Sequence, residues 1–327
     1  MTAPLPPRAA QRLEGDEPVP PEWRGSVVAV GNFDGVHRGH LAVLQTALLA
    51  KRDVGRPAVV LTFEPHPRKL FGGEPVFRLT PPGERALLLG MLGFAGVVEQ
   101  PFTREFASLE AEEFVQRILV DRLAASRVVV GHDFRFGAGR RGDVATLAAN
   151  GAFTTVEAAA FEDGGEPISS SRIRAALGTG DVETASALLG RRWRISAPVS
   201  HGRKVGRTLG YPTANMALPP SVDLAHGIYA VRYRRADGTL HDGVASYGRR
   251  PTFDDGAALL ETFLFDFDGD LYGETGHVSL FAFLRGERKF DGVEALIAQM
   301  DRDSLAARAA LAAATPLSEW DRMLNFP

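Results

Sequence analysis

Two patterns of apolar positions divide the chain, and they meet near residues 186–192. Before this point, short runs of aliphatic and β-branched residues alternate with stretches whose apolar residues recur at helical spacing. After it, short alternating or apolar runs follow one another, with turn residues between them. The chain therefore predicts an α/β domain followed by a mainly β domain.

The N-terminal pattern predicts a parallel sheet with helices on both faces, because strands that are apolar throughout are buried on both sides. The predicted strands are residues 27–30, 58–63, 96–99, 127–130 and 153–158, and the predicted helices are residues 41–51, 83–92, 110–123 and 144–149. Ligands of such sheets bind beyond the carboxyl ends of the strands.

The C-terminal pattern predicts a small antiparallel barrel, because several short strands follow one another without helices between them. Its strands are expected at residues 193–200, 229–234, 240–246, 261–267 and 277–283, and Asp237-Gly238 is a strong hairpin signal. Two closing helices are expected near residues 292–300 and 304–314.

The domain plan is then a flexible tail over residues 1–23, a first domain over 24–187 and a second over 188–327. Of the 327 residues, 45% are hydrophobic and 24% are charged, as in a soluble globular protein with a sizeable core.

A net charge of −3 gives no reason to expect nucleic acid or an anionic membrane as a partner. The absence of cysteine excludes disulfides, thiolate metal sites and cysteine nucleophiles. The longest apolar run, residues 86–98, is too short to span a bilayer. Residues 1–23 lack the apolar centre of a signal peptide, so a cytoplasmic location is expected, and no obligatory protein partner is inferred.

The first predicted strand leads into a glycine turn, V-V-A-V-G-N-F-D-G-V-H-R-G-H, and then into a helix. Gly31 and Gly35 permit a tight turn, and the free amides of a helix start can bind a phosphate. His37 and His40 share one face of that helix start and could donate to charge that develops on a phosphoanhydride. Alternatively, they are surface or metal-binding histidines. No G-x-x-x-x-G-K-[ST] occurs, which excludes a P-loop.

Three more polar clusters follow predicted strands: T-F-E-P-H-P from Thr62, G-H-D-F-R-F-G from Gly131 and I-S-S-S-R-I-R from Ile168. The first is either a substrate loop or a structural turn in which prolines hold His66 in an extended loop. The second could stack a flat ring and bind phosphate, or form a solvated basic loop. The third could cap a helix or, with its arginines, bind a phosphate.

The second half carries a basic glycine loop, G-R-K-V-G-R-T-L-G from Gly202, which suits phosphates. Thr213 and Asn215 present two oxygen ligands on one side of an extended segment, as Mg²⁺ beside a nucleotide prefers. Glu261 opens an otherwise apolar strand and is either an edge charge or a general base.

The four N-terminal motifs, in this order and at this spacing, resemble the first module of prokaryotic bifunctional riboflavin kinase/FAD synthetases. The resemblance implies a Rossmann-like nucleotidyltransferase fold that adenylylates FMN, with His37 and His40 on the ATP phosphates. It assigns nucleotide binding to Gly31, Phe33, Asp34, Gly35, Gly39, Ser170, Ser171 and Arg174. It assigns flavin binding to Phe63, Pro65, His66, Asp133 and Arg135.

The second half resembles the riboflavin kinase module of the same family, through G-R-K-V-G-R-T-L-G-Y-P-T-A-N, G-x-R-P-T-F, E-T-F-L-F-D-F-D-G-D-L-Y-G and F-L-R-G-E-R-K-F. The resemblance implies that Thr213 and Asn215 hold Mg²⁺-ATP and that Glu261 deprotonates the ribityl hydroxyl. It assigns nucleotide binding to Gly202, Lys204, Gly206 and Gly210. One departure is Ser246, where many members have asparagine.

The expected protein is thus a two-domain transferase that makes FMN from riboflavin and ATP, and FAD from FMN and a second ATP. Another nucleotidyltransferase, acting on a different phosphate or on CTP, would fit the histidine turn but would not account for the second module. A non-catalytic flavin carrier would need neither the histidine pair nor Thr213, Asn215 and Glu261.

Overall fold

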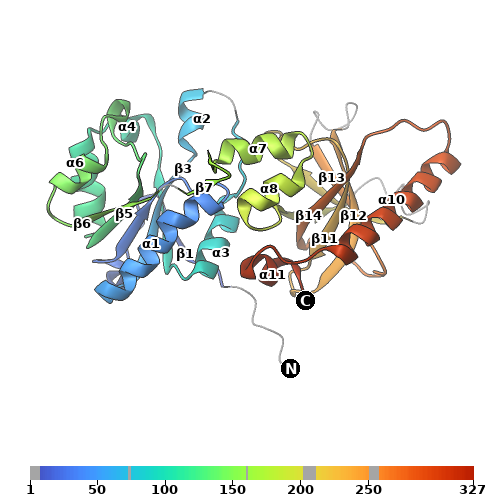
Figure 1. Ribbon diagram of the computed structural model, residues 1–327, viewed down its shortest axis with the longest axis horizontal. Coiled ribbons are helices and arrows are strands. Elements are labelled where there is room, and N and C mark those ends of the chain that lie inside the picture. Colours follow the sequence, from blue (N-terminus) through green and yellow to red (C-terminus); the bar gives the residue numbers. More distant parts are fainter. Residues whose placement is uncertain (1–7, 73–74, 160, 202–210, 250–257) are drawn as a thin grey trace. The chain divides into compact units, whose positions relative to one another are not determined.

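The computed structural model describes residues 8–72, 75–159, 161–201, 211–249 and 258–327. The chain forms two compact units, Met1–Ser169 and Ser170–Pro327, each with its own sheet. Figure 1 labels their elements along the chain. We describe each unit by itself.

The first unit is built on a six-stranded sheet in the order β1-β4-β3-β2-β5-β6, in which every strand pairing is parallel. The strands are β1 (Gln11–Glu14), β2 (Val27–Val30), β3 (Ala58–Glu64), β4 (Gly96–Pro101), β5 (Arg127–Gly131) and β6 (Thr154–Ala158). The five strands expected from the sequence are confirmed, and so is their parallel arrangement.

Both faces of this sheet are covered, as its apolar strands predicted. On one face, Val28 and Val30 of β2 share a core with Phe114 and Leu119. These two come from α5 (Ala111–Phe114) and the π-helical turn that continues it (Val115–Arg122). On the other, α1 (Arg38–Val54) packs against β2 and β5. The remaining elements of the unit are α2 (Pro67–Gly72), α3 (Pro82–Leu92), α4 (Arg104–Ala107), α6 (Val144–Ala149) and the hairpin β7 (Glu162–Asp163)–β8 (Glu166–Pro167).

The expectation of a flexible tail over residues 1–23 is wrong for much of that stretch. Strand β1 pairs with β4 at the sheet edge, Leu13 is buried, and Trp23 packs into the core. Four residues among charges and prolines carry too little periodicity to be recognised as a strand, since their order depends on pairing with β4.

The second unit contains a closed barrel of six strands in the order β10-β13-β12-β11-β14-β9, all antiparallel. These are β9 (Arg194–Ser200), β10 (Thr213–Leu218), β11 (Gly227–Arg234), β12 (Leu240–Arg249), β13 (Ala258–Leu264) and β14 (Thr275–Gly286). The predicted barrel and its hairpin at Asp237-Gly238, between β11 and β12, are confirmed.

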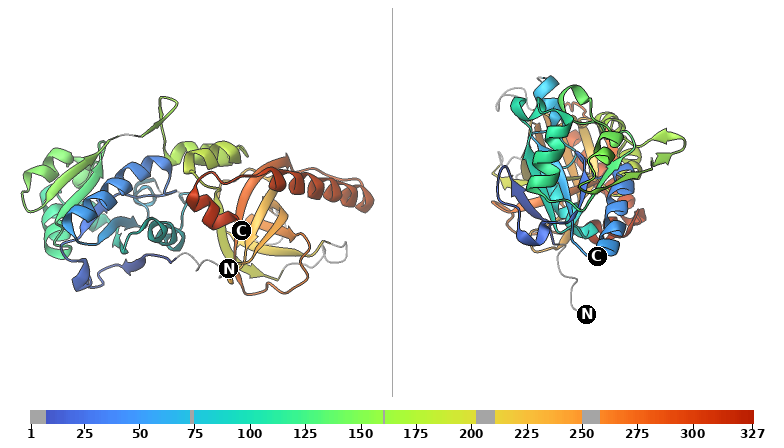
Figure 2. Two further views of the ribbon diagram at one scale, coloured as in Figure 1. Left: turned by 60° about the horizontal axis from the view of Figure 1, so that its bottom comes forward. Right: turned by 90° about the vertical axis from the view of Figure 1, so that its left-hand side faces the viewer.

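The C-terminal helices differ from the prediction. One continuous helix, α10 (Val293–Ala313), replaces the two that were expected, and it runs along the outside of the barrel (Figure 2). Residues 301–303, which lay between the two expected helices, are helical as well, and Asp303 among them is buried and pairs with Arg285. A further helix, α11 (Glu319–Asn325), was not predicted.

Helices α7 (Ser170–Gly178) and α8 (Val182–Leu189) belong to the compact unit that holds the barrel. The carbonyl of Leu177 accepts a hydrogen bond from the amide of Ala225 at 3.0 Å, and α8 packs against β14. Gly180 adopts φ 82° so close to the Phe283 ring that an added Cβ would lie 3.0 Å from it. The boundary predicted at residues 187/188 falls inside α8, whereas the compact units divide at Ser169/Ser170, before both helices.

These contacts predict a difference between two fragments. A fragment of residues 188–327 keeps the whole barrel and should fold, whereas a fragment of residues 170–327 also keeps α7 and α8. We expect the longer fragment to be more stable by about 3 kcal/mol, the contribution of one or two buried aliphatic side chains. Urea unfolding monitored by circular dichroism measures this difference. Equal free energies of unfolding would mean that the two helices do not stabilise the barrel.

Candidate functional site

The strand order of the first unit places its candidate site. From β2 the chain proceeds to β3 on one side, whereas β5 lies on the other side of β2. Such a reversal leaves a crevice at the carboxyl ends of the two strands, where open α/β sheets bind ligands. The Gly31–His40 motif follows β2, and the motif that begins at Gly131 follows β5.

The turn after β2 is shaped by packing around Phe33. This residue is buried with φ 47°, and an added Cβ on Gly31 would lie 2.9 Å from its ring. The same ring contacts His40 edge-on, with 5.3 Å between the centroids. Gly31 is therefore needed because Phe33 lies against the backbone there.

Asp34 holds the same turn from inside the protein. Its carboxylate, 1% exposed, accepts hydrogen bonds from the amides of Leu79 at 3.3 Å and Thr80 at 2.9 Å. The amide of Gly35 in turn donates to Thr80 Oγ1 at 2.8 Å. These contacts give Asp34 and Gly35 a role in shaping the turn.

His37 and His40 stack with 3.5 Å between ring centroids and 18° between ring planes, on the shared face that their spacing predicted. His37 is the N-cap of α1, and its Nδ1 accepts from the amide of His40 at 3.2 Å. A nitrogen that accepts carries no proton, so the neutral His37 ring carries its proton on Nε2. Burial, and secondarily the neighbouring His37, hold the pKa of His40 well below its usual value.

The helix start lies against the segment that leads into the serine-arginine motif. An added Cβ on Gly39 would lie 3.0 Å from the carbonyl oxygen of Ile168, so this position is tight for any larger residue. Two residues later in the chain α7 begins, and its first turns carry Ser170, Ser171 and Arg174. The sequence expectation that this motif enters a helix is confirmed.

After β3, the peptide between Glu64 and Pro65 is cis and Pro67 begins α2, so the expected extended loop is instead a turn followed by a short helix. His66 is buried, and its Nδ1 accepts from the amide of Arg68 at 3.2 Å. Two flanking prolines could not reveal a helix start, although proline is common at that position.

Phe63 belongs to a cluster of aromatic rings that the sequence analysis did not identify. Its ring lies 5.7 Å from Phe102 and 6.0 Å from Phe106, and Phe71 of α2 lies 6.1 Å from Phe102. Phe71 is 74% exposed, which is unusual for so large an apolar side chain. The sequence could have revealed this cluster. Phe102 directly follows β4 and Phe106 follows in α4, at the same sheet edge as Phe63.

The motif after β5 forms a turn in which Asp133 is exposed and Phe134 and Phe136 stack at 5.5 Å. Arg135 is half exposed and pairs with Asp143 at 3.2 Å. Asp143 is also the N-cap of α6, which explains its lowered pKa: the amide and hydroxyl of Thr146 donate to it, and Arg135 adds its charge.

The second unit brings its candidate residues together through strand register. Asn215 of β10 is paired with Glu261 of β13, and Glu261 is paired with Ser246 of β12. Directly paired residues point to the same face of a sheet, and Thr213, two residues before Asn215, shares that face. In the sequence, Glu261 belongs to a different motif from Thr213 and Asn215, and the register brings the two motifs together.

Asn215 has a side chain oriented by its own strand. Its Nδ2 donates to the carbonyl of Thr213 at 3.1 Å, and the residue is buried. Among the residues that the structure describes, its Oδ1 has no hydrogen-bond partner. A buried amide oxygen without a donor is a site that a cation can fill.

Two further residues flank this group. The Phe263 ring lies 4.8 Å from the ring of Tyr211, and the Tyr211 hydroxyl donates to Asp301 of α10. Gly202, Lys204, Gly206 and Gly210 lie outside the described residues. In the described part of the chain, no three histidine or acidic side chains form a cluster that could hold a metal ion.

The family models match both halves in the order of these two sites. The family described as FAD synthetase matches residues 19–172, and the family described as riboflavin kinase matches residues 189–311. A bifunctional riboflavin kinase/FMN adenylyltransferase of Pseudomonas fluorescens is 41% identical over 303 residues, which cover 91% of this chain and 97% of that protein. The chain belongs to this family.

Other comparisons agree with this assignment. Proteins of the same description from Escherichia coli K12 and Bacillus subtilis are 40% and 36% identical, over 87% and 88% of this chain and 92% of each relative. A crystal structure described as a macrolide-efflux protein from Streptococcus pneumoniae matches with a TM-score of 0.81 and 33% identity, over 91% of this chain and 98% of that one. Within the described residues, no helix is both long and apolar enough to cross a membrane.

The lowered pKa of His40 predicts a pH-dependent stability. The folded protein binds fewer protons at His40 than the unfolded chain does, so this contribution is complete above a pH of about 6.5 and is lost as the pH falls below that value. Calorimetry from about pH 7.5 to about pH 5.5 should show the first unit losing stability more steeply in the wild type than in His40→Gln. Parallel pH profiles for the two proteins would contradict the assignment of this effect to His40.

Proposed function

We propose that the second unit phosphorylates riboflavin and that the first unit adenylylates the product. In the first reaction, the terminal hydroxyl of the ribityl chain attacks the γ-phosphorus of ATP, giving FMN and ADP. In the second, an FMN phosphate oxygen attacks the α-phosphorus of another ATP, giving FAD and pyrophosphate. The order of the two matched families along the chain supports this division.

The observation that carries the kinase assignment is the alignment of Asn215 with Glu261 across β10 and β13. The buried Oδ1 of Asn215, without a partner among the described residues, fits a Mg²⁺ ligand, with Thr213 as the second oxygen on that face. When bound, Mg²⁺ neutralises charge on the phosphate oxygens of ATP. Mg²⁺ usually keeps several waters and binds substrate phosphate oxygens, so it needs only a few ligands from the protein and no cluster of carboxylates.

Glu261 would act as the general base. A primary hydroxyl is a poor nucleophile, and a carboxylate within hydrogen-bond reach can accept its proton as the bond to phosphorus forms. The register places this carboxylate beside the proposed metal ligand, as a base next to the transferred phosphoryl group requires. Ser246 is paired with Glu261. Many members of the family have asparagine at this position, and serine lacks the amide group with which asparagine could contact a ligand.

In the first unit, the stacked histidines at the start of α1 would stabilise charge on the phosphates of ATP. The N-terminus of a helix attracts anions through its free amides. The Nε2–H of His37 can donate a hydrogen bond to a phosphate oxygen, and a stronger donation as charge builds up lowers the barrier. No covalent intermediate is needed, because the FMN phosphate is itself the nucleophile.

The remaining assigned residues have complementary roles in this proposal. Ser170, Ser171 and Arg174 would bind the ATP phosphates, and the turn of Gly31–Gly35 with Gly39 would present the amides of the helix start to the nucleotide. The flavin would lie against the group that contains Phe63, Pro65 and His66, with Asp133 and Arg135 across from it. The exposed ring of Phe71 supports this placement, since it offers a face on which a flat ring can stack.

Glu261→Gln tests the kinase assignment. Glutamine has nearly the same shape but cannot accept the proton, so riboflavin phosphorylation should fall by roughly 10²- to 10⁴-fold. FAD formation from added FMN should be unchanged in the same preparation, since that site lies in the other unit. Chromatography of the flavins measures both rates. Full kinase activity would make Glu261 a strand-edge charge without a catalytic role.

His40→Ala tests the adenylyltransferase assignment. The amides of the helix start remain, so the variant should fold and still bind ATP, but FAD formation from FMN should fall because transition-state charge loses a donor. FMN should accumulate when riboflavin is supplied. Wild-type FAD output from the folded variant would remove His40 from the mechanism.

A further inference from the structure

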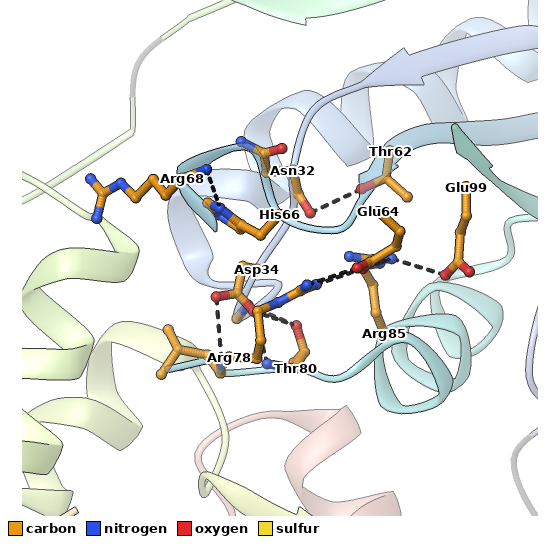
Figure 3. Close-up of polar contacts among 12 residues, drawn as sticks. Asn32, Asp34, Thr62, Glu64, His66, Arg68, Arg78, Thr80, Arg85 and Glu99 are labelled. Atoms are coloured by element: carbon orange, nitrogen blue, oxygen red, sulfur yellow. Dashed lines mark hydrogen bonds and ion pairs between the residues drawn. The ribbon is translucent and has the colours of Figure 1, made fainter. Parts of the chain in front are cut away.

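A short segment before α3, residues 78–80, contacts the two loops that lead to His37, His40 and His66. Arg78, Leu79 and Thr80 follow one another, and we call them the 78–80 clamp. One loop is the turn after β2 with Asp34, and the other begins with Glu64 at the end of β3. Figure 3 shows Arg78 between these two carboxylates and Thr80 beside Asp34. None of the three residues belongs to a motif recognised in the sequence.

Thr80 fixes the turn after β2 through three hydrogen bonds. Its amide donates to Asp34 Oδ1 at 2.9 Å, its hydroxyl donates to the same oxygen at 3.3 Å, and its Oγ1 accepts from the amide of Gly35 at 2.8 Å. Thr80 is fully buried, so water cannot replace these bonds. The hydroxyl thus determines the position of the backbone two residues before His37.

Arg78 joins this turn to the loop after β3. Its guanidinium binds Glu64 through two hydrogen bonds, at 2.9 and 2.7 Å, and its Nε lies 3.6 Å from Asp34 Oδ1. Burial alone would lower the pKa of Arg78, but Glu64 and Asp34 outweigh it and raise the pKa. Burial alone would likewise raise the pKa of Glu64, which Arg78 and Arg85 instead lower. Arg78 and Glu64 are therefore both charged at neutral pH.

The far side of Glu64 is held as well. Arg85 Nη2 lies 2.9 Å from Glu64 Oε1 and 2.9 Å from Glu99 Oε1, and Glu99 pairs with Arg12 of β1. Across the carboxyl ends of β2, β3 and β4, charges thus alternate in sign along the series Asp34, Arg78, Glu64, Arg85 and Glu99. Such a network fixes relative position, because moving one member leaves another buried charge unpaired.

We propose that the 78–80 clamp is a positioning element for FMN adenylylation, and that it holds the stacked histidines and the His66 loop in the geometry that the transition state requires. None of its residues needs to touch substrate. The reaction is sensitive to such positioning because a displacement of about 1 Å at reacting groups can cost about 10²-fold in rate. The proposal rests on the assignment of adenylylation to the first unit.

The test compares Thr80→Val with Thr80→Ser. Valine has nearly the same shape but leaves the Gly35 amide without its acceptor, whereas serine keeps the hydroxyl. We expect Thr80→Val to lower kcat for FAD formation by about 10- to 100-fold while KM for ATP and FMN changes by less than about threefold. Thr80→Ser should stay within about threefold of the wild-type kcat. Riboflavin phosphorylation by the same preparations should be unchanged.

Thr155→Val is the matched control. Thr155 lies on β6 in the same unit, and its buried Oγ1 has no hydrogen-bond partner among the described residues. Valine there removes a hydroxyl without breaking a hydrogen bond, so both activities should remain at wild-type values.

Where Thr80→Val fails to fold, Arg78→Lys replaces it. Lysine keeps the charge but cannot bind Glu64 through two nitrogens, so kcat for FAD formation should fall by about tenfold. Its control is Arg117→Lys, which affects an exposed pair with Glu113.

Two outcomes overturn the proposal. If Thr80→Val lowers the melting temperature but leaves kcat of the folded protein unchanged, the clamp is structural only. If Thr80→Ser loses as much activity as Thr80→Val, the hydroxyl does not carry the effect. His40→Ala distinguishes a failure of the clamp proposal from a failure of the proposed function. If His40→Ala is inactive and Thr80→Val is active in FAD formation, the adenylylation site stands and only the role of the clamp is contradicted.

Discussion

A buried guanidinium sets the arrangement of the first unit's sheet edge. Arg85 has no exposed surface, and a buried charge is tolerated only where opposite charges face it. Glu64 and Glu99 supply them from the ends of two neighbouring strands. Each carboxylate then needs a second cation, which Arg78 and Arg12 provide. The pairing of Arg12 with Glu99 helps to explain why β1 joins the sheet instead of forming part of a tail.

The strands could be predicted from the sequence wherever one segment carries its own pattern. Val27–Val30 and Arg127–Gly131 are apolar enough to identify themselves, and Asp237-Gly238 identifies a hairpin without its partner strands. Strand β1 and the continuity of α10 could not be predicted, because each depends on a distant partner. The four-residue strand β1 is ordered by β4, and the carboxylate of Asp303 can be buried in the middle of α10 because Arg285 pairs with it.

The candidate sites divide in the same way. The histidine pair at the start of α1 was predictable, since three-residue spacing at a helix start fixes a shared face. The alignment of Asn215, Glu261 and Ser246 was not, because register between antiparallel strands is set by pairing across the barrel. The 78–80 clamp gave no sequence signal at all. A threonine and an arginine before a helix are ordinary residues until the fold places two carboxylates beside them.

The two units handle charge in opposite ways, and this follows from the groups each must accommodate. At the sheet edge of the first unit, the carboxylates of Asp34, Glu64 and Glu99 each pair with an arginine. In our proposal the phosphates of a nucleotide would therefore meet backbone amides and the neutral imidazole of His40. On the barrel, Asn215 Oδ1 has no donor among the described residues and lies on the same face as the carboxylate of Glu261, an arrangement that favours a cation. The first site thus has its charges balanced by the fold, whereas in our proposal the second site would receive a positive charge together with the nucleotide. Substitutions that break a pair should therefore disturb geometry in the first unit, and substitutions of oxygen ligands should disturb ion binding in the second.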